Sequence, residues 1–109
     1  MNYTFKENQL DYETYYILRK SVKWNNWSRE QAEIALVNSY YTVTVFDNKV
    51  PIGMGRAVGD GIYFMIMDIV VKPEYQRMGI GSTIIHMLLE HIEKNMCVGS
   101  RVSVQLISE

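Results

Sequence analysis

The chain has 109 residues, enough for one hydrophobic core, because single domains commonly run to about 100–150 residues. Its composition, 48% hydrophobic and 21% charged, is typical of a folded protein and not of a disordered one. The 11 basic and 12 acidic residues give a net charge of -1, without the positive excess that is typical of nucleic-acid binding. We therefore expect a single domain over residues 1–109 and no nucleic-acid partner.

The sequence also bears on location. The one cysteine, Cys97, cannot form a disulfide within the chain, which favours a reducing compartment. No segment approaches the roughly 20 apolar residues of a membrane span, and the N-terminus has no apolar stretch of signal-peptide length. We expect a cytoplasmic protein that does not associate with a membrane.

The first third of the chain is predicted to form a short strand over residues 3–6 and then two helices. Asp11 precedes the first helix, residues 12–22, and can accept hydrogen bonds from its first N–H groups. Ser28, with a glutamine three residues later, gives the second helix, residues 29–38, a capping-box start. The polar stretch between the two helices is expected to be a loop.

An antiparallel hairpin is predicted next. Residues 41–46 alternate as a strand rich in β-branched and aromatic residues, and residues 47–49 form a turn. The returning strand, residues 50–58, has two distinct faces. One face carries Ile52, Met54, Arg56 and Val58, and the other carries Gly53, Gly55 and Ala57.

The last part of the chain reads as strand, helix, strand. Residues 62–71 are almost continuously apolar apart from Asp68, the pattern of a central strand buried on both faces. A long helix with a wide apolar stripe begins at Gly81, and residues 100–107 alternate as a final strand. This order predicts a right-handed crossover between parallel strands. We therefore predict an α+β fold with a mixed, mainly antiparallel sheet and helices on both faces.

The loop between the apolar strand and the long helix, Gln76–Gly81, points to chemistry. Its glycines let the backbone turn tightly, and the helix N-terminus presents N–H groups and partial positive charge to an anion. Arg77 adds a cation. No Walker sequence follows, and Ile84 stands where the dinucleotide fingerprint has its third glycine. Taken alone, the glycine pair is equally compatible with a structural turn.

The stretch from Asp68 to Ser82 resembles motif A of the GNAT superfamily of acyl-CoA N-acyltransferases. The core pattern of that motif is Gln or Arg, two variable residues, Gly, one variable residue, then Gly or Ala; Gln76, Gly79 and Gly81 match it. The resemblance implies a three-layer fold and an acetyl-CoA-dependent N-acetyltransferase that acts on a primary amine of a small molecule or peptide. The alternatives are a catalytically impaired coenzyme A-binding or assembly module of the same fold, and an interaction domain whose glycines only shape a turn.

The resemblance implies a coenzyme A site built largely from backbone and no metal. Loop N–H groups would hold the pyrophosphate, the strand would pair with the pantetheine arm, and an N–H freed at a strand bulge would stabilise the thioester oxygen. The implied positions are Ile69, Val70, Val71, Gln76, Arg77, Met78, Gly79, Ile80, Gly81 and Ser82.

Catalytic and acceptor-binding candidates lie outside that loop. The attacking amine must lose a proton, and Asp68 is the candidate base because it is the one charged residue in an apolar strand. Alternatively, Asp68 lies at a bulge and bonds backbone or solvent. Trp24, Asn25 and Trp27 lie where family members often build the acceptor pocket, or else they form a lid over the core. Arg56 could meet an acidic group of the acceptor or remain a solvated arginine.

The sequence departs from the family at its C-terminus. It stops at Glu109, directly after the fifth predicted strand, whereas family members continue with a helix and a closing hairpin. That further segment usually carries a tyrosine that protonates the leaving thiolate. The expected open sheet edge and poorly covered apolar face predict a homodimer or a higher oligomer.

Overall fold

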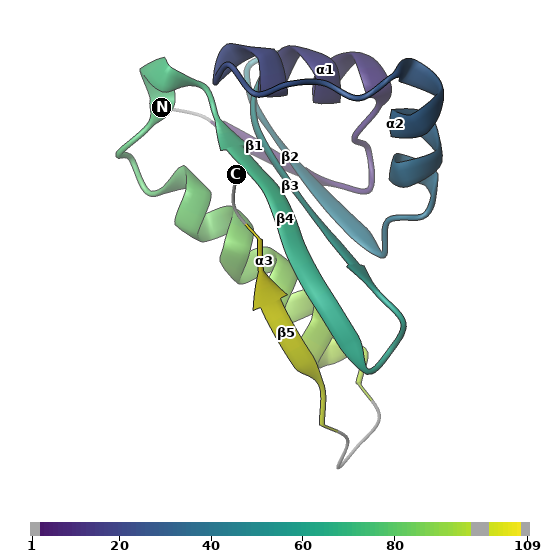
Figure 1. Cartoon of the computed structure of the whole chain (residues 1–109). Helices are drawn as coiled ribbons and strands as arrows, with labels where there is room; N and C mark the ends of the chain where they lie inside the picture. Colours follow the sequence, from purple (N-terminus) through teal and green to yellow (C-terminus); the bar gives the residue numbers. More distant parts are fainter. Residues whose placement is uncertain (1–2, 97–100, 108–109) are drawn as a thin grey trace.

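The computed structural model describes residues 3–96 and 101–107 (Figure 1). In chain order its elements are β1 (Tyr3–Glu7), α1 (Tyr12–Ser21), α2 (Arg29–Val37), β2 (Tyr41–Asp47), β3 (Val50–Gly59), β4 (Tyr63–Val71), the 3-10 helix η1 (Pro73–Tyr75), α3 (Ile80–Lys94) and β5 (Ser103–Leu106). The strands form one 5-stranded sheet in the order β1-β2-β3-β4-β5. All pairs are antiparallel except β4 and β5, which are parallel. Helices α1 and α2 lie on one face and α3 on the other, so the predicted fold class is confirmed.

The two N-terminal helices begin where their capping residues predict. The side chain of Asp11 accepts a hydrogen bond from Thr14 N at 2.9 Å, and that of Ser28 accepts one from Gln31 N at 3.2 Å. Helix α2 packs less than its apolar residues suggest, because only Ala32 is buried in it. The sequence therefore predicts the ends of α2 better than its packing.

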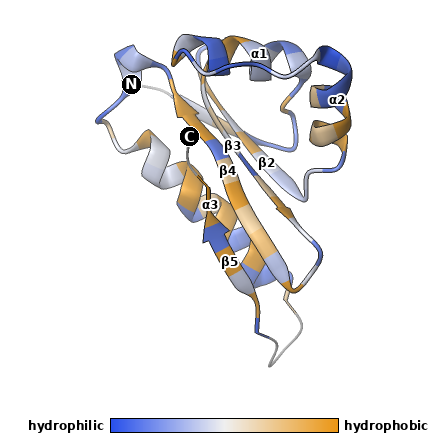
Figure 2. Ribbon diagram, in the orientation of Figure 1, coloured by the Kyte–Doolittle hydropathy of each residue, from blue (hydrophilic) through white to orange (hydrophobic). Residues whose placement is uncertain are grey.

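Helix α3 supplies the core on its face of the sheet. Its buried residues, Ile80, Ile84, Leu88 and Ile92, follow one helical stripe and pack on β2, β3 and β4. Figure 2 shows this hydrophobic stripe against a hydrophobic β4. Gly55 lets the helix approach closely, since a Cβ there would lie 2.5 Å from Ile84 Cγ2 and 2.6 Å from Ile69 Cδ1. The prediction that Gly53, Gly55 and Ala57 share a face is consistent with this packing.

Strand β4 lies between β3 and the edge strand β5, so it is not at the centre of the sheet. The predicted burial on both faces is wrong for its first half, where Tyr63 is 66% exposed and Met65 is 39% exposed. Figure 1 shows the reason, because α1 and α2 cover only the other end of that sheet face. A continuously apolar sequence reports hydrophobicity and cannot report how far a neighbouring helix extends.

A β-bulge interrupts β4 at Asp68. Arg56 faces Met67 and Met54 faces Val70 across the β3–β4 pair, so β4 has one more residue than β3 over this interval. Asp68 has a φ of 55°, in the left-handed region. The β4–β5 pairing ends just before the bulge, where Ile107 N donates to Ile66 O at 2.8 Å. Beyond this point no described strand pairs with β4 on its β5 side.

Candidate functional site

The first candidate cavity lies where β4 runs into α3 and has a volume of about 360 Å³. Its lining residues are Ile69, Val71, Tyr75, Gln76, Arg77, Gly79, Ile80, Gly81 and Ser82. The structure therefore brings together every predicted cofactor-binding residue except Val70 and Met78. Tyr75 is a lining residue that the sequence analysis missed, although it directly precedes the motif.

The side chains of Val70 and Met78 point elsewhere. Val70 is 2% exposed and belongs to the core under α1, on the opposite face of the sheet. Met78 is 51% exposed, and its sulfur accepts a hydrogen bond from the Tyr3 hydroxyl at 3.4 Å. Neither side chain lines the cavity, so only the main chain of these two residues is available to a ligand there.

The loop backbone forms a concave cradle for an anion. Arg77 and Gly79 both have left-handed backbones, with φ of 66° and 83°. Helix α3 has no side-chain cap and no acidic residue in its first turn, so its first N–H groups and partial positive charge stay available. A Cβ at Gly79 would meet nothing within 4 Å, which leaves open space above the loop. These features together favour binding of phosphate groups.

Two side-chain hydrogen bonds hold this loop against the sheet. Gln76 Nε2 donates to Val71 O at 2.9 Å, which ties the motif's glutamine to the end of β4. The Tyr75 hydroxyl donates to Asp47 Oδ2 at 2.6 Å, and this bond raises the pKa of Tyr75. Because both anchors lie on the sheet, the cradle keeps a fixed position relative to the open edge of β4.

A second cavity, of about 160 Å³, lies beside the β4 bulge on the α1 face of the sheet. It is lined by Arg19, Trp24, Trp27, Arg56, Met67, Asp68 and Ile107. The candidate base Asp68 and the tryptophans of the α1–α2 loop, far apart in sequence, therefore share one cavity. Arg56, the candidate partner of an acidic acceptor group, lies in the same cavity.

Asp68 is the centre of a buried charge cluster. Its Oδ1 lies 2.6 Å from Arg19 Nη1, and its Oδ2 lies 2.7 Å from Arg56 Nε. The Tyr15 hydroxyl also donates to Oδ2 at 2.9 Å. Burial and then the neighbouring Asp68 carboxylate raise the pKa of Tyr15. Asp68 does lie at a bulge, as the alternative reading of the sequence expected, but its side chain bonds arginines and a tyrosine.

Arg19 connects the charge cluster to the α1–α2 loop. Its Nε and Nη2 donate to the carbonyl oxygen of Asn25 at 3.2 and 2.6 Å. Its guanidinium lies 5.2 Å from the ring centre of Trp24 and 5.9 Å from that of Trp27, within cation–π range. Asn25 therefore contributes its backbone carbonyl, and the tryptophans pack around a cation.

Sequence reasoning missed Tyr15 and Arg19 as members of the site. The available signal was their spacing of four residues, which places an arginine on the same face of α1 as a core tyrosine. A buried arginine requires a partner, and Asp68 was the one carboxylate in an apolar strand. Pairing the two would have predicted the cluster.

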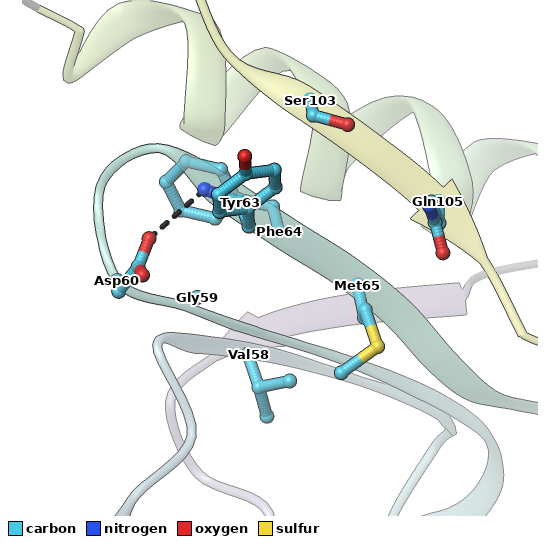
Figure 3. Close-up of a pocket in the computed structure, with 8 residues that line it drawn as sticks. All are labelled: Val58, Gly59, Asp60, Tyr63, Phe64, Met65, Ser103 and Gln105. Atoms are coloured by element: carbon cyan, nitrogen blue, oxygen red, sulfur yellow. Dashed lines mark hydrogen bonds between the residues drawn. The ribbon is translucent and has the colours of Figure 1, made fainter.

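A third cavity, of about 350 Å³, lies at the β3–β4 turn beside β5 (Figure 3). Figure 3 shows Val58 and Met65 on neighbouring strands and the carboxylate of Asp60 bonded to Tyr63 N. Asp60 Oδ1 accepts from Ile62 N and Tyr63 N, both at 2.9 Å, and these bonds lower the pKa of Asp60. The Asp60 carboxylate is thus engaged by backbone N–H groups of the turn. Most of the remaining cavity wall is apolar, with Val58, Phe64 and Met65 among its lining residues.

The described ranges 3–96 and 101–107 contain neither a metal-ligand cluster nor a membrane-spanning helix. Within them, no cluster of three or more His, Cys, Asp or Glu side chains is arranged to hold a metal ion. No helix in these ranges combines the length and apolar character needed to cross a membrane. Cys97 lies outside the described residues.

Solved structures with the same architecture include two bacterial proteins. SA2161 from meticillin-resistant Staphylococcus aureus, described as a probable acetyltransferase, is 34% identical with a TM-score of 0.88; the match covers 99% of this chain and 80% of that one. SP0256 from Streptococcus pneumoniae, described as a GNAT family acetyltransferase, is 31% identical with a TM-score of 0.81, over 99% and 76% of the two chains.

The sequence comparisons agree with the structural ones. An uncharacterized N-acetyltransferase, ycf52 of Pyropia yezoensis, is 30% identical over 79 residues, which is 68% of this chain and 45% of that protein. The match thus spans less than half the length of this curated relative. The sequence pattern of the acetyltransferase (GNAT) family matches residues 3–106, nearly the whole chain. The chain therefore belongs to the GNAT family of acetyltransferases.

Proposed function

We propose that this protein binds acetyl-CoA and transfers its acetyl group directly to a primary amine of a small molecule or peptide. The observation that carries the proposal is the cradle at Arg77–Ser82, which opens beside a stretch of β4 that no described strand pairs with on its β5 side. Family membership supports the same conclusion. The cradle provides N–H groups for the pyrophosphate, and the strand provides main-chain groups for the pantetheine arm.

The residues of the first cavity fit this cosubstrate. The left-handed loop and the open space above Gly79 allow phosphate groups to approach the backbone. Main-chain groups of Ile69 and Val71 lie beyond the last β4–β5 pair, where a linear arm could extend the sheet. Bound acetyl-CoA would supply the thioester, and an N–H near the bulge would stabilise the oxyanion.

We propose that Asp68 orients the acceptor amine and accepts its proton. A carboxylate has about four acceptor positions, and Arg19, Arg56 and Tyr15 use three of them in this structure. Oδ1 accepts one of these bonds and Oδ2 accepts two, so Oδ1 retains a position for the amine. The second cavity lies directly beside it, with Trp24 and Trp27 as its aromatic walls. We assign acceptor binding to these tryptophans and to the loop around Asn25.

We also propose that the protein forms a homodimer or a higher oligomer. Strand β5 lies at the sheet edge, and its residues are all exposed. Apolar side chains around it are exposed too, including Tyr63 at 66% and Leu106 at 59%. The apolar cavity in Figure 3 continues this surface. Pairing of two such edges would bury it, and a monomeric mass by light scattering at micromolar concentration would argue against this assembly.

A cytoplasmic location is part of the same proposal. It rests on the single cysteine in the sequence, which favours a reducing compartment. Fluorescence microscopy of the tagged protein in its own cells would test it, and signal confined to an organelle or to the cell surface would contradict it.

The function is tested by calorimetric titration with acetyl-CoA, followed by a thiol-release assay over a panel of amines with the same sample. We expect saturable binding and release of coenzyme A that depends on an amine. Binding without release would support the alternative, a coenzyme A-binding module of the same fold. Absence of binding would exclude both.

A further inference from the structure

We infer that the acceptor is a small amine that carries a carboxylate close to its amino group, and that Arg56 recognises this carboxylate. The inference rests on the proposed acyl transfer and names the class of its acceptor.

Arg56 uses only part of its hydrogen-bonding capacity within the protein. Nε donates to Asp68 Oδ2 at 2.7 Å, and Nη1 donates to Ser39 Oγ at 3.2 Å. Nη2 has no hydrogen-bond partner among the described residues. Among the described residues, Thr44 Oγ1 is the one fully buried side-chain nitrogen or oxygen atom without a hydrogen-bond partner. Arg56 Nη2 also lacks a partner, so it is not fully buried and remains accessible to solvent. The Arg56 side chain is nevertheless only 10% exposed.

The guanidinium is therefore oriented before any ligand arrives. Asp68 and Ser39 fix it from two sides, so little side-chain entropy remains to be lost when an anion binds. A guanidinium presents planar N–H groups that match a carboxylate, and such charge-assisted bonds are about twice as strong as neutral ones. A neutral amine without an acidic group would leave Nη2 without a partner.

The position of Arg56 limits how far the carboxylate can lie from the amine. Arg56 pairs with Met67 across the sheet, directly beside the bulge residue Asp68. The proposed acetyl transfer takes place at this bulge, so anion and amine must meet within one small cavity of about 160 Å³. This geometry suits an amino carboxylate with both groups on the same carbon or on adjacent carbons.

The remaining walls indicate the character of the rest of the acceptor. Trp24, Trp27, Met67 and Ile107 line the cavity and offer aromatic and apolar surface. An apolar or aromatic side chain would pack on these walls while the carboxylate meets Arg56. The α-carboxyl group of a peptide's first residue is converted to an amide, so the inference favours free amino acids over peptides that lack an acidic first residue.

The test compares leucine and phenylalanine with their amides, which have the same shape without the negative charge. With acetyl-CoA present, we expect coenzyme A release at least tenfold more efficient for each acid than for its amide, as kcat/KM. In Arg56→Gln we expect the two to differ by less than threefold. Arg29→Gln, a surface change on α2 whose side chain is 60% exposed, should keep the full preference.

A binding measurement makes the result independent of turnover and of amine basicity. The only tryptophans of the chain, Trp24 and Trp27, both line the cavity, so their fluorescence reports occupancy. We expect N-acetylphenylalanine to bind at least tenfold more tightly than N-acetylphenylalaninamide. We expect Arg56→Gln, checked for native circular dichroism, to remove the difference, and Arg56→Lys to restore part of it.

Equal binding of the acid and its amide, absence of binding by both, or a preference that survives in Arg56→Gln would overturn the inference. Acetylation of the amides as fast as the acids would overturn it too while leaving the proposed function intact. Failure of acetyl-CoA to bind would instead remove the proposed function, and the N-acetyl compounds would still decide the role of Arg56.

Discussion

Arg19 Nη1 and Asp68 Oδ1 lie 2.6 Å apart in the interior, so one ion pair ties helix α1 to the bulge of β4. Asp68→Asn would leave the guanidinium groups of Arg19 and Arg56 without their shared carboxylate. Because a buried charge without its partner is costly, we expect a loss of about 3–5 kcal/mol in the free energy of unfolding. Urea denaturation measures this. Glu13→Gln, at an ion pair on the surface, should change it by less than about 0.5 kcal/mol.

The pH dependence of turnover distinguishes a role of Asp68 in proton transfer from a role in positioning alone. If Asp68 accepts the proton of the amine, Asp68→Asn slows turnover mostly below the pH at which the amine is already neutral. The pH–rate profile of the variant would then shift to higher pH. A profile that is lower but has the same shape would assign Asp68 to positioning alone.

Gly79 and Gly61 form a matched pair for testing the cradle. Both have positive φ, 83° and 104°, and a Cβ at either position would meet nothing within 4 Å. Valine at either site therefore brings similar backbone strain, but only at Gly79 does it extend over the proposed phosphate position. We expect Gly79→Val to weaken acetyl-CoA binding at least tenfold by calorimetry and Gly61→Val to leave it unchanged. Equal affinities in the two variants would refute the assigned site.

Gly55 is required by the close approach of α3 to the sheet. An added Cβ would lie 2.5 Å from Ile84 Cγ2 and 3.2 Å from Leu88 Cδ1, so the helix or its side chains would have to move. We expect Gly55→Ala to lower the free energy of unfolding by about 1–3 kcal/mol. At Gly81 the added Cβ meets nothing closer than 3.8 Å, and Gly81→Ala should be neutral or slightly stabilising. Chemical denaturation measures both variants. A Gly55→Ala protein as stable as Gly81→Ala would contradict the close packing of α3 at Gly55.

Stability at high pH should depend on Tyr15. Its pKa is raised in the folded state, chiefly by burial and then by Asp68, so folding favours the protonated phenol. This contribution is fully present below the ordinary tyrosine pKa of about 10 and is lost as the pH rises through the higher folded value. The pKa of Tyr41 is raised as well, by burial and by its hydrogen bond to Glu7. We expect the free energy of unfolding to fall above about pH 10.

Tyr15→Phe separates the contribution of Tyr15 from that of other groups. It should lower stability by about 1–2 kcal/mol at pH 8, because Asp68 loses a buried hydrogen bond. Above about pH 10 the difference between the two proteins should shrink. A difference that stays constant between pH 8 and pH 11 would contradict the raised pKa.

Local features of the fold could be predicted because their causes are local. Asp11 and Ser28 cap helices through bonds to residues three positions later. Alternation predicts the faces of the hairpin except at Ile52, where the register shifts: Ile52 packs in the core on the α3 side and does not share the face of Met54. The exposure of Tyr63 could not be predicted, because it depends on where α1 and α2 end over the sheet. The position of the loop between β4 and α3, where we propose the anion site, could be predicted from one contiguous motif. The partners of Asp68 could not, since they come from a helix and a strand far away in the sequence.

The extra residue at Asp68 reverses the alternation of side chains between the two faces of β4. Ile66 before the bulge and Ile69 and Val71 after it all pack toward α3, although Ile69 and Val71 follow Ile66 by three and five positions, odd intervals that would place them on opposite faces of a regular strand. Deletion of one residue at this point would turn every later side chain of the strand to the opposite face. Ile69 and Val71 would then leave the cavity next to the cradle, and the charge cluster would lose its carboxylate. A single inserted residue thus lets one strand contribute to the hydrophobic core, to the proposed ligand edge and to a polar cavity.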